Sequence, residues 1–314
     1  MTKKSKLIVS IIATVCLVII ILGVCLGVFL CKSNNISFEV KDNLTDGNNR
    51  KARVILLGGQ SNASGCSRDE YLKKNVSREK YSEYENGYDN VYINYITSQN
   101  ESKGFVKCST LQGEFGECFG PELGMAEKLN EMYPEDLFFI IKCAWGGTNL
   151  YEQWLSPSSP GKTGILYSKF VKYVETSMKY LISKNYEVEI DGMCWMQGES
   201  DSFSVEHATK YEQHLNNFIN DVRKKFSKYQ NDGIAFIDAY IDAKPAYWVY
   251  YEMVNTSKQK VAEMSSLNVV IDTVAEGLTC TKEPEGTPDM AHYDSLSEIK
   301  LGHLFIEEIA KFFK

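Results

Sequence analysis

The chain has 314 residues, and its 44% hydrophobic and 24% charged residues are ordinary for a globular protein with a full-sized core. Its formal net charge of -7 and pI near 5.3 argue against nucleic acid binding, because a phosphate-binding surface needs clustered lysine and arginine.

An uncharged apolar stretch follows three lysines at the N-terminus and covers residues 7–31. At a helical rise of about 1.5 Å per residue, it is long enough to cross a hydrocarbon core of roughly 30 Å, so it predicts a transmembrane helix. A cleaved signal peptide is the alternative, although its apolar region is usually shorter and ends at a small-residue site that residues 28–31 do not supply. The lysines favour a signal anchor with residues 1–6 in the cytoplasm and the remainder extracellular or lumenal.

Residues 32–51 are mostly polar, with several Asn, and predict a stalk before a folded domain over 52–314. Of the nine cysteines, those beyond the apolar stretch are Cys66, Cys108, Cys118, Cys143, Cys194 and Cys280. An oxidising exterior permits them to form disulfides, but Cys143 and Cys194 lie in apolar runs that also suit core thiols. No C-x-x-C pair occurs, so the cysteines do not predict a metal site.

The domain alternates apolar runs with amphipathic segments. Strands are predicted at Arg53–Leu57, Leu137–Cys143, Ile190–Met196, Ile234–Tyr240 and Asn268–Val274. Helices are predicted at Gly120–Met132, Leu166–Ser183, Val205–Tyr229, Ser257–Met264 and Ser295–Phe313. This alternation is typical of an α/β fold in which helices cover both faces of a parallel sheet. The stretch Ser67–Phe119 shows no clear strand or helix and is interpreted as long loops over the site that shape specificity.

A serine follows the first predicted strand in the sequence Gly59-Gln60-Ser61-Asn62. A tight turn there presents the Ser61 hydroxyl as a nucleophile and points its own N–H at a developing oxyanion. An isolated motif of this kind is equally consistent with a Ser or Asn that caps the next helix.

Two further segments follow predicted strands. Gly146 and Gly147 permit close backbone approach to a ligand, and an N–H of this pair is a second candidate oxyanion donor. The block Gln197–Asp201 offers the Gln197 amide as a third donor, and its Glu199 orients the loop or contacts substrate hydroxyls. Because ligands of parallel sheets bind outside the carboxyl ends of the strands, these segments are expected to form one site.

Asp289 and His292 stand three residues apart, just before the last predicted helix. On a turn they face the same side, so Asp289 accepts from the Nδ1–H of His292 and leaves Nε2 directed at Ser61. His207, His214 and His303 lie in predicted helices, where solvated or packed imidazoles are the better explanation.

These blocks together resemble the sialate O-acetylesterase and acetylxylan esterase group, carbohydrate esterase family 6, of the SGNH hydrolases. The resemblance covers nearly all of residues 52–314 and implies a three-layer α/β/α, flavodoxin-like fold with a central parallel sheet. It also implies metal-free deacetylation of O-acetylated sugars, with no cofactor and with Ser61, Asp289 and His292 as the triad. Ala63 departs from the Met that this group commonly has, which concerns the shape of the acyl pocket.

The sequence thus predicts a serine esterase that removes acetyl groups from sialic acid or xylan-type glycans through an acetyl-enzyme. The expected oxyanion donors are Ser61, Gly147 and Gln197, and the expected substrate-binding residues are Gln60, Asn62, Gly146 and Glu199. Two alternatives stay open: an O-acyltransferase that uses the same triad, and an inactive glycan-binding ectodomain.

Overall fold

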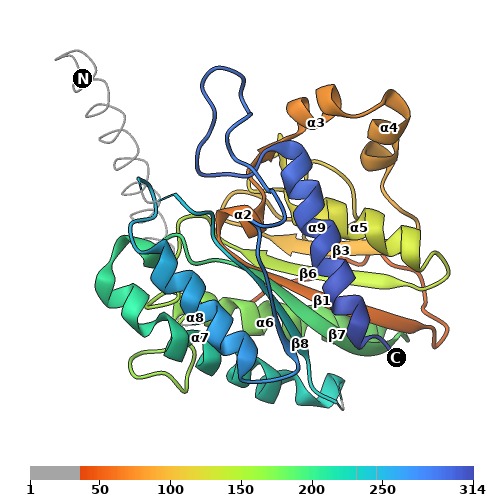
Figure 1. Ribbon diagram of the computed structural model, residues 1–314. Helices are drawn as coiled ribbons and strands as arrows, with labels where there is room; N and C mark the ends of the chain where they lie inside the picture. The colour runs from red at the N-terminus through yellow and green to blue at the C-terminus, as the bar shows by residue number, and fades with distance from the viewer. Residues whose placement is uncertain (1–35, 231, 245) are drawn as a thin grey trace. The chain divides into compact units, whose positions relative to one another are not determined.

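The computed structural model describes residues 36–230, 232–244 and 246–314 (Figure 1). The predicted cytoplasmic segment 1–6 and transmembrane helix 7–31 lie outside these residues. Within the described ranges, no helix combines the length and the apolar character that a bilayer crossing requires.

The core of the domain is a seven-stranded sheet in the order β4-β3-β6-β1-β7-β8-β9. Its strands are β1 (Lys51–Gly59), β3 (Val91–Ile96), β4 (Val106–Lys107), β6 (Phe138–Ala144), β7 (Glu187–Met196), β8 (Ala235–Ala239) and β9 (Asn268–Ile271). All neighbours pair in parallel except β3 and β4, which pair antiparallel. The prediction of a mostly parallel α/β sheet is therefore confirmed.

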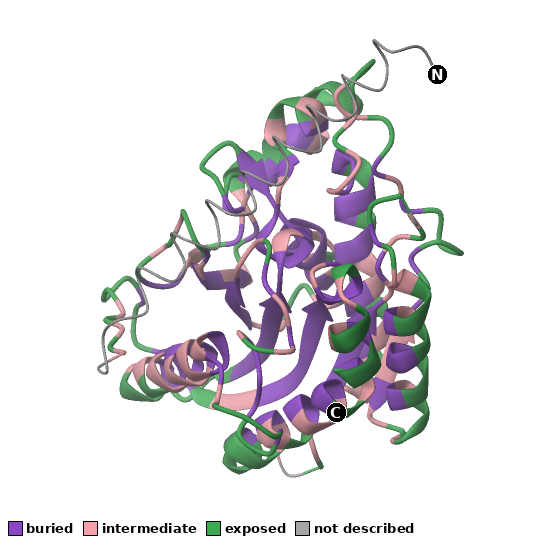
Figure 2. Ribbon diagram, turned by 90° about the vertical axis from the view of Figure 1, so that its left-hand side faces the viewer, coloured by how far each residue is buried: buried purple, intermediate pink, exposed green. Residues whose placement is uncertain are grey.

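The central strands are mostly apolar because helices cover both faces of the sheet. Every residue of β6 is buried, and β1 is buried from Ala52 onward (Figure 2). Side chains alternate between the two faces along a strand, so Gly192 and Trp195 of β7, three residues apart, face opposite sides. Gly192 lies against Ile309 of one helix, whereas Trp195 packs on Phe218 of another. The sheet is thus the middle of three layers.

The helices divide between the two faces. The larger ones are α5 (Pro121–Met132), α6 (Ile165–Ser183), α7 (Val205–Phe226), α8 (Tyr251–Glu263) and α9 (Ser295–Ile309). Helices α5 and α9 cross closely on the Gly192 face, because Gly124 and Gly302 have no side chain to separate their backbones. The Trp195 face carries α6 and α7, joined by Phe170 and Phe218, and α8, whose Lys258 reaches Asp238 of β8 (Figure 1).

The prediction of long loops over Ser67–Phe119 is wrong. This stretch contains two strands of the main sheet, the helices α3 (Asp69–Asn75) and α4 (Arg78–Asn86), and a small antiparallel pair of β2 (Ser67–Arg68) with β5 (Cys118–Phe119). Strand β3 escaped recognition because Asn94 interrupts its apolar pattern. In the fold, Asn94 is buried and its polar atoms are satisfied by Ser177 and Tyr173 of α6.

The segment that the sequence predicts to be a stalk lies against the domain over its described residues. Phe38 packs edge-on against Tyr173, with ring centroids 5.1 Å apart, and Leu44 is buried. The backbone N–H groups of Asn43 and Leu44 donate to the Tyr180 hydroxyl at 3.1 and 3.0 Å. Residues 38–44 thus form an extended strap on α6.

The six cysteines beyond the apolar stretch are all free thiols. Cys143 and Cys194 lie in β6 and β7, which flank β1, so two strand spacings of about 4.8 Å separate their backbones. That distance exceeds the span of a disulfide, and both side chains serve as core thiols.

Candidate active site

The turn after β1 presents Ser61 at the carboxyl edge of the sheet. Gly59 has φ 138°, and a Cβ there would lie 2.0 Å from the carbonyl oxygen of Met196, so only glycine fits. The Gln60 N–H donates to the same carbonyl at 2.9 Å, and the short helix α2 (Ser61–Ser64) begins at once. Ser61 itself is partly exposed.

The loop after β6 lies directly beside this serine. A Cβ on Gly146 would stand 3.7 Å from the Cβ of Ser61. Gly147 has φ 67° and faces open space, since a Cβ there would meet no atom within 4 Å. Over the described residues, no hydrogen bond occupies the backbone N–H of Ser61 or of Gly147. Both are therefore free to donate to a substrate oxygen.

The Gln197 amide, which the sequence suggests as a third oxyanion donor, is turned into the protein. Gln197 is 0% exposed, and its Nε2 donates to Gln60 Oε1 at 3.2 Å, to the Thr148 carbonyl at 3.0 Å and to Asp201 Oδ2 at 2.6 Å. Three acceptors already share its two N–H groups. In this arrangement Gln197 joins the loops after β1, β6 and β7, and leaves no donor for an oxyanion.

Gln60 and Asp201 belong to the same buried network. Gln60 Oε1 also accepts from the N–H groups of Gly198 and Ser200, at 3.3 and 3.2 Å, so its oxygen holds the loop after β7. Asp201 accepts from the N–H groups of Leu150 and Tyr151, at 2.8 and 3.1 Å. Burial raises the pKa of Asp201 to about 6. The oxygen of Gln60 is thus committed to this loop, and the predicted substrate contact of Gln60 stays a prediction.

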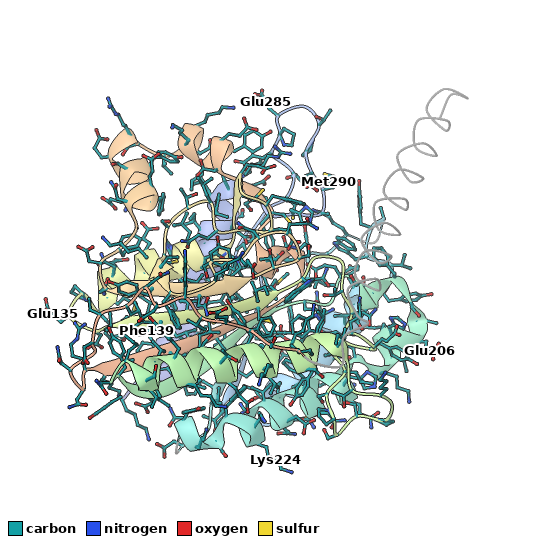
Figure 3. The ribbon with its side chains drawn as sticks, turned by 180° about the vertical axis from the view of Figure 1, so that it is seen from behind. Glu135, Phe139, Glu206, Lys224, Glu285 and Met290 are labelled. Carbon is teal, nitrogen blue, oxygen red and sulfur yellow. The ribbon has the colours of Figure 1, made fainter. Side chains whose placement is uncertain are left out.

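The loop that precedes α9 carries the aspartate and histidine pair. His292 Nδ1 and Asp289 Oδ2 are 2.7 Å apart, and Asp289 Oδ1 accepts from the N–H of Ala291 at 3.1 Å. Figure 3 shows Met290 on this loop, at the end of the molecule opposite Lys224. Burial acts to raise the pKa of Asp289, but the hydrogen bond and charge of His292, together with the backbone N–H groups of residues 291 and 292, outweigh it and lower that pKa below the ordinary value.

Cys66, which the sequence suggests only as a candidate for a disulfide, is a neighbour of this pair. Burial acts to lower the pKa of His292, whereas Cys66 and the bond to Asp289 act in the opposite direction and raise it well above the ordinary value. Cys66 comes directly before β2, close in sequence to Ser61, which is the only signal that would have suggested it.

Asn62 connects the serine turn to the histidine loop. Its side chain bonds to backbone atoms of Ala291 and Tyr293, the two neighbours of His292. Because Asn62 follows Ser61 directly, these contacts bring the serine turn against the loop that carries the imidazole. Glu199, in turn, accepts from the Asn62 amide.

Glu114 is a second residue that sequence reasoning missed. Its buried carboxyl carbon would lie 3.9 Å from a Cβ on Gly146, and its Oε2 has no hydrogen-bond partner in the described structure. Glu114 lies between β4 and β5, in the stretch without recognisable periodicity, so no pattern singled it out.

The remaining histidines have structural contacts, as predicted. His207 stacks on Tyr151 with ring centroids 4.2 Å apart, His214 is buried, and His303 Nε2 is 2.9 Å from Glu127 Oε2.

The fold is similar to several solved structures. A protein from Arabidopsis thaliana gives a TM-score of 0.59 at 18% identity, over 83% of this chain and 99% of that chain. NanS gives 0.59 at 16% identity, over 86% and 98%. XAC1771, a carbohydrate acetylesterase from Xanthomonas citri, gives 0.54 at 14% identity, over 82% of this chain and 56% of that one. At these identities the likeness concerns the fold.

The family assignment comes from the sequence. No curated protein matches the chain. The family model described as carbohydrate esterase, sialic acid-specific acetylesterase, however, matches residues 51–311, which is nearly the whole folded domain. The chain therefore belongs to this carbohydrate esterase family, and the protein is an esterase.

Proposed function

We propose that the protein hydrolyses O-acetyl esters on carbohydrates through an acetyl-serine intermediate on Ser61. The observation that carries the proposal is the Asp289–His292 pair, 2.7 Å apart, on a loop that Asn62 ties to the serine turn. A nucleophile, a base and a carboxylate that orients the base are the parts that acyl transfer requires.

In the proposed reaction, His292 takes the proton of Ser61 while the hydroxyl oxygen attacks the acetyl carbonyl. The N–H groups of Ser61 and Gly147 donate to the tetrahedral oxyanion. His292 then protonates the departing sugar oxygen, and a water molecule, activated by the same imidazole, releases acetate and restores the serine. Asp289 keeps the imidazole in the tautomer that leaves Nε2 free to act as the base.

The test compares Ser61→Ala with Ser82→Ala, an exposed serine of α4. On an aryl acetate, Ser61→Ala is expected to lower kcat by about three orders of magnitude or more with its melting temperature unchanged, because it removes the covalent route. Ser82→Ala should retain full activity and, like the wild type, should react with a fluorophosphonate. A folded Ser61→Ala protein with wild-type turnover would refute the proposal.

The substrate is to be found by measuring acetate release from acetylated sialic acids, acetylated xylan and acetylated peptidoglycan fragments. The same assay with an added acceptor sugar separates hydrolysis from acyl transfer. If water is the acceptor, acetate should be released both with and without the added sugar. A transferase should instead move the acetyl group to the added sugar.

A further inference from the structure

The side chain of Asn62 forms hydrogen bonds with the backbone on both sides of His292. Its Oδ1 accepts from the N–H of Tyr293 at 3.2 Å, and its Nδ2 donates to the carbonyl of Ala291 at 3.4 Å. The carbonyl of Tyr293 is held in turn by the Ser67 hydroxyl at 2.7 Å. The residue after the proposed nucleophile therefore determines where the proposed base stands.

Glu199 determines which way the Asn62 amide points. Its Oε1 accepts from Asn62 Nδ2 at 2.8 Å. Because Oε1 accepts this bond, it selects the NH₂ side of the amide and leaves the amide oxygen for the N–H of Tyr293. The other orientation would place the NH₂ group against that N–H and lose all three bonds of the amide.

Both side chains are enclosed. Asn62 is 3% exposed and Glu199 is 2% exposed, and Glu199 Oε2 is buried with no hydrogen-bond partner in the described part of the chain. Leaving such an oxygen unpaired costs about 1–3 kcal/mol, so the carboxyl is not explained by stability. Of the two roles that the sequence suggests for Glu199, this enclosure favours orientation of the loop, while the predicted substrate contacts of Asn62 and Glu199 stay predictions.

We propose that Asn62 and Glu199 are positioning residues: together they hold residues 291–293 so that the His292 imidazole meets the Ser61 hydroxyl. This inference rests on the proposed function only for its kinetic consequence. The arrangement of the His292 loop itself is open to measurement without a substrate.

The first test is Asn62→Ala, with Asn94→Ala as the matched control. Asn94 is 1% exposed and also bridges two segments, through Ser177 and Tyr173, but far from the serine turn. Asn62→Ala should lower kcat about 10- to 100-fold with KM within about twofold, since a small displacement of a catalytic group has an effect of this size. Asn94→Ala should lower the melting temperature and leave kcat unchanged. A wild-type kcat for Asn62→Ala would overturn the proposal.

The second test separates positioning from substrate binding at Glu199. Glu199→Gln keeps an acceptor oxygen for Asn62 and should retain kcat within about fivefold, whereas Glu199→Ala removes it and should match Asn62→Ala. If either variant raised KM with kcat unchanged, Glu199 would be a substrate contact and the proposal would be wrong.

The third test measures the environment of the His292 imidazole by NMR and needs no catalysis. The chain has four histidines, so ring nitrogen and proton signals can be assigned by NMR with His292→Gln as the reference. Asn62→Ala and Glu199→Ala should shift the His292 Nδ1–H signal and its titration midpoint, and Asn94→Ala should shift neither. If the wild-type protein hydrolysed no ester but these two variants still shifted the His292 signals, the positioning role would be supported and the proposed function refuted. Unshifted signals in an active protein would refute the positioning role alone.

Discussion

Two aspartates near the site, Asp289 and Asp201, occupy opposite environments. The side chain of Asp289 is 51% exposed and bonds to His292, whereas Asp201 is fully buried and accepts from three donors. Asp289 is thus placed to act on the imidazole, and Asp201 to hold the loops that surround it.

Asp289→Asn should lower kcat by about 10³- to 10⁴-fold with little change in melting temperature, because an amide does not hold the required imidazole tautomer. Asp201→Asn should instead destabilise the fold by about 1–3 kcal/mol, because one buried donor loses its acceptor. Steady-state kinetics and thermal unfolding of the two variants check this. Equal effects on kcat would mean that the pairing of Asp289 with His292 is misread.

The raised pKa of His292 has a direct kinetic consequence. The base is the neutral imidazole, so kcat/KM should rise with pH through the pKa of His292, at a midpoint above the ordinary value of about 6.5. The same shift stabilises the fold fully below about pH 6.5, and this stabilisation is lost as pH rises through the folded-state pKa.

Cys66→Ala tests the cause of that shift. Because Cys66 acts to raise the pKa of His292, its removal should move the midpoint of kcat/KM toward acid. Cys194→Ala, a core thiol of β7, serves as the control and should leave the midpoint unchanged. A midpoint of kcat/KM at or below pH 6.5 in the wild-type protein would contradict the raised pKa of His292.

At the scale of elements, the ends of β1 and β7 meet so closely that one backbone position controls the serine turn. Gly59→Ala would force a Cβ to within 2.0 Å of the Met196 carbonyl at a φ of 138°. We expect a loss of about 1–3 kcal/mol in the free energy of unfolding and a lower kcat, because the turn that presents Ser61 must shift.

Gly116→Ala is the matched control, since Gly116 is exposed and a Cβ there meets no atom within 4 Å. It should leave both quantities unchanged. Thermal unfolding and aryl acetate turnover measure the two effects, and a fully active, stable Gly59→Ala protein would show that the turn tolerates a side chain.

At the scale of the whole molecule, the domain begins earlier than the first strand. A protein that starts at Ser37 should fold with the stability of the domain, whereas one that starts at Arg50 loses the buried Leu44 and the Phe38–Tyr173 contact. Burial of such side chains is worth about 1.5–3 kcal/mol each, so the shorter protein should unfold at a lower temperature. Equal melting temperatures would show that the strap adds nothing.

The pattern of the sequence was sufficient for the central strands β1, β6 and β7 and for the helices α6 and α7, which follow β6 and β7. Their apolar runs and helical periodicity are local properties that burial on both sides of a sheet imposes. The same is true of Ser61, Asp289 and His292 as candidates, because a serine in a glycine turn and a carboxylate three residues from a histidine are visible in one dimension.

Only the tertiary structure decided which polar side chains face the open site and which form their hydrogen bonds inside the protein. Gln60, Gln197 and Asn62 carry the same amide group, and nothing in their local sequence says that the bonds of Gln60 and Gln197 join three loops while those of Asn62 reach Ala291 and Tyr293. Hydrogen-bond partners of buried amides come from segments far apart in the chain, so their orientation depends on how those segments pack.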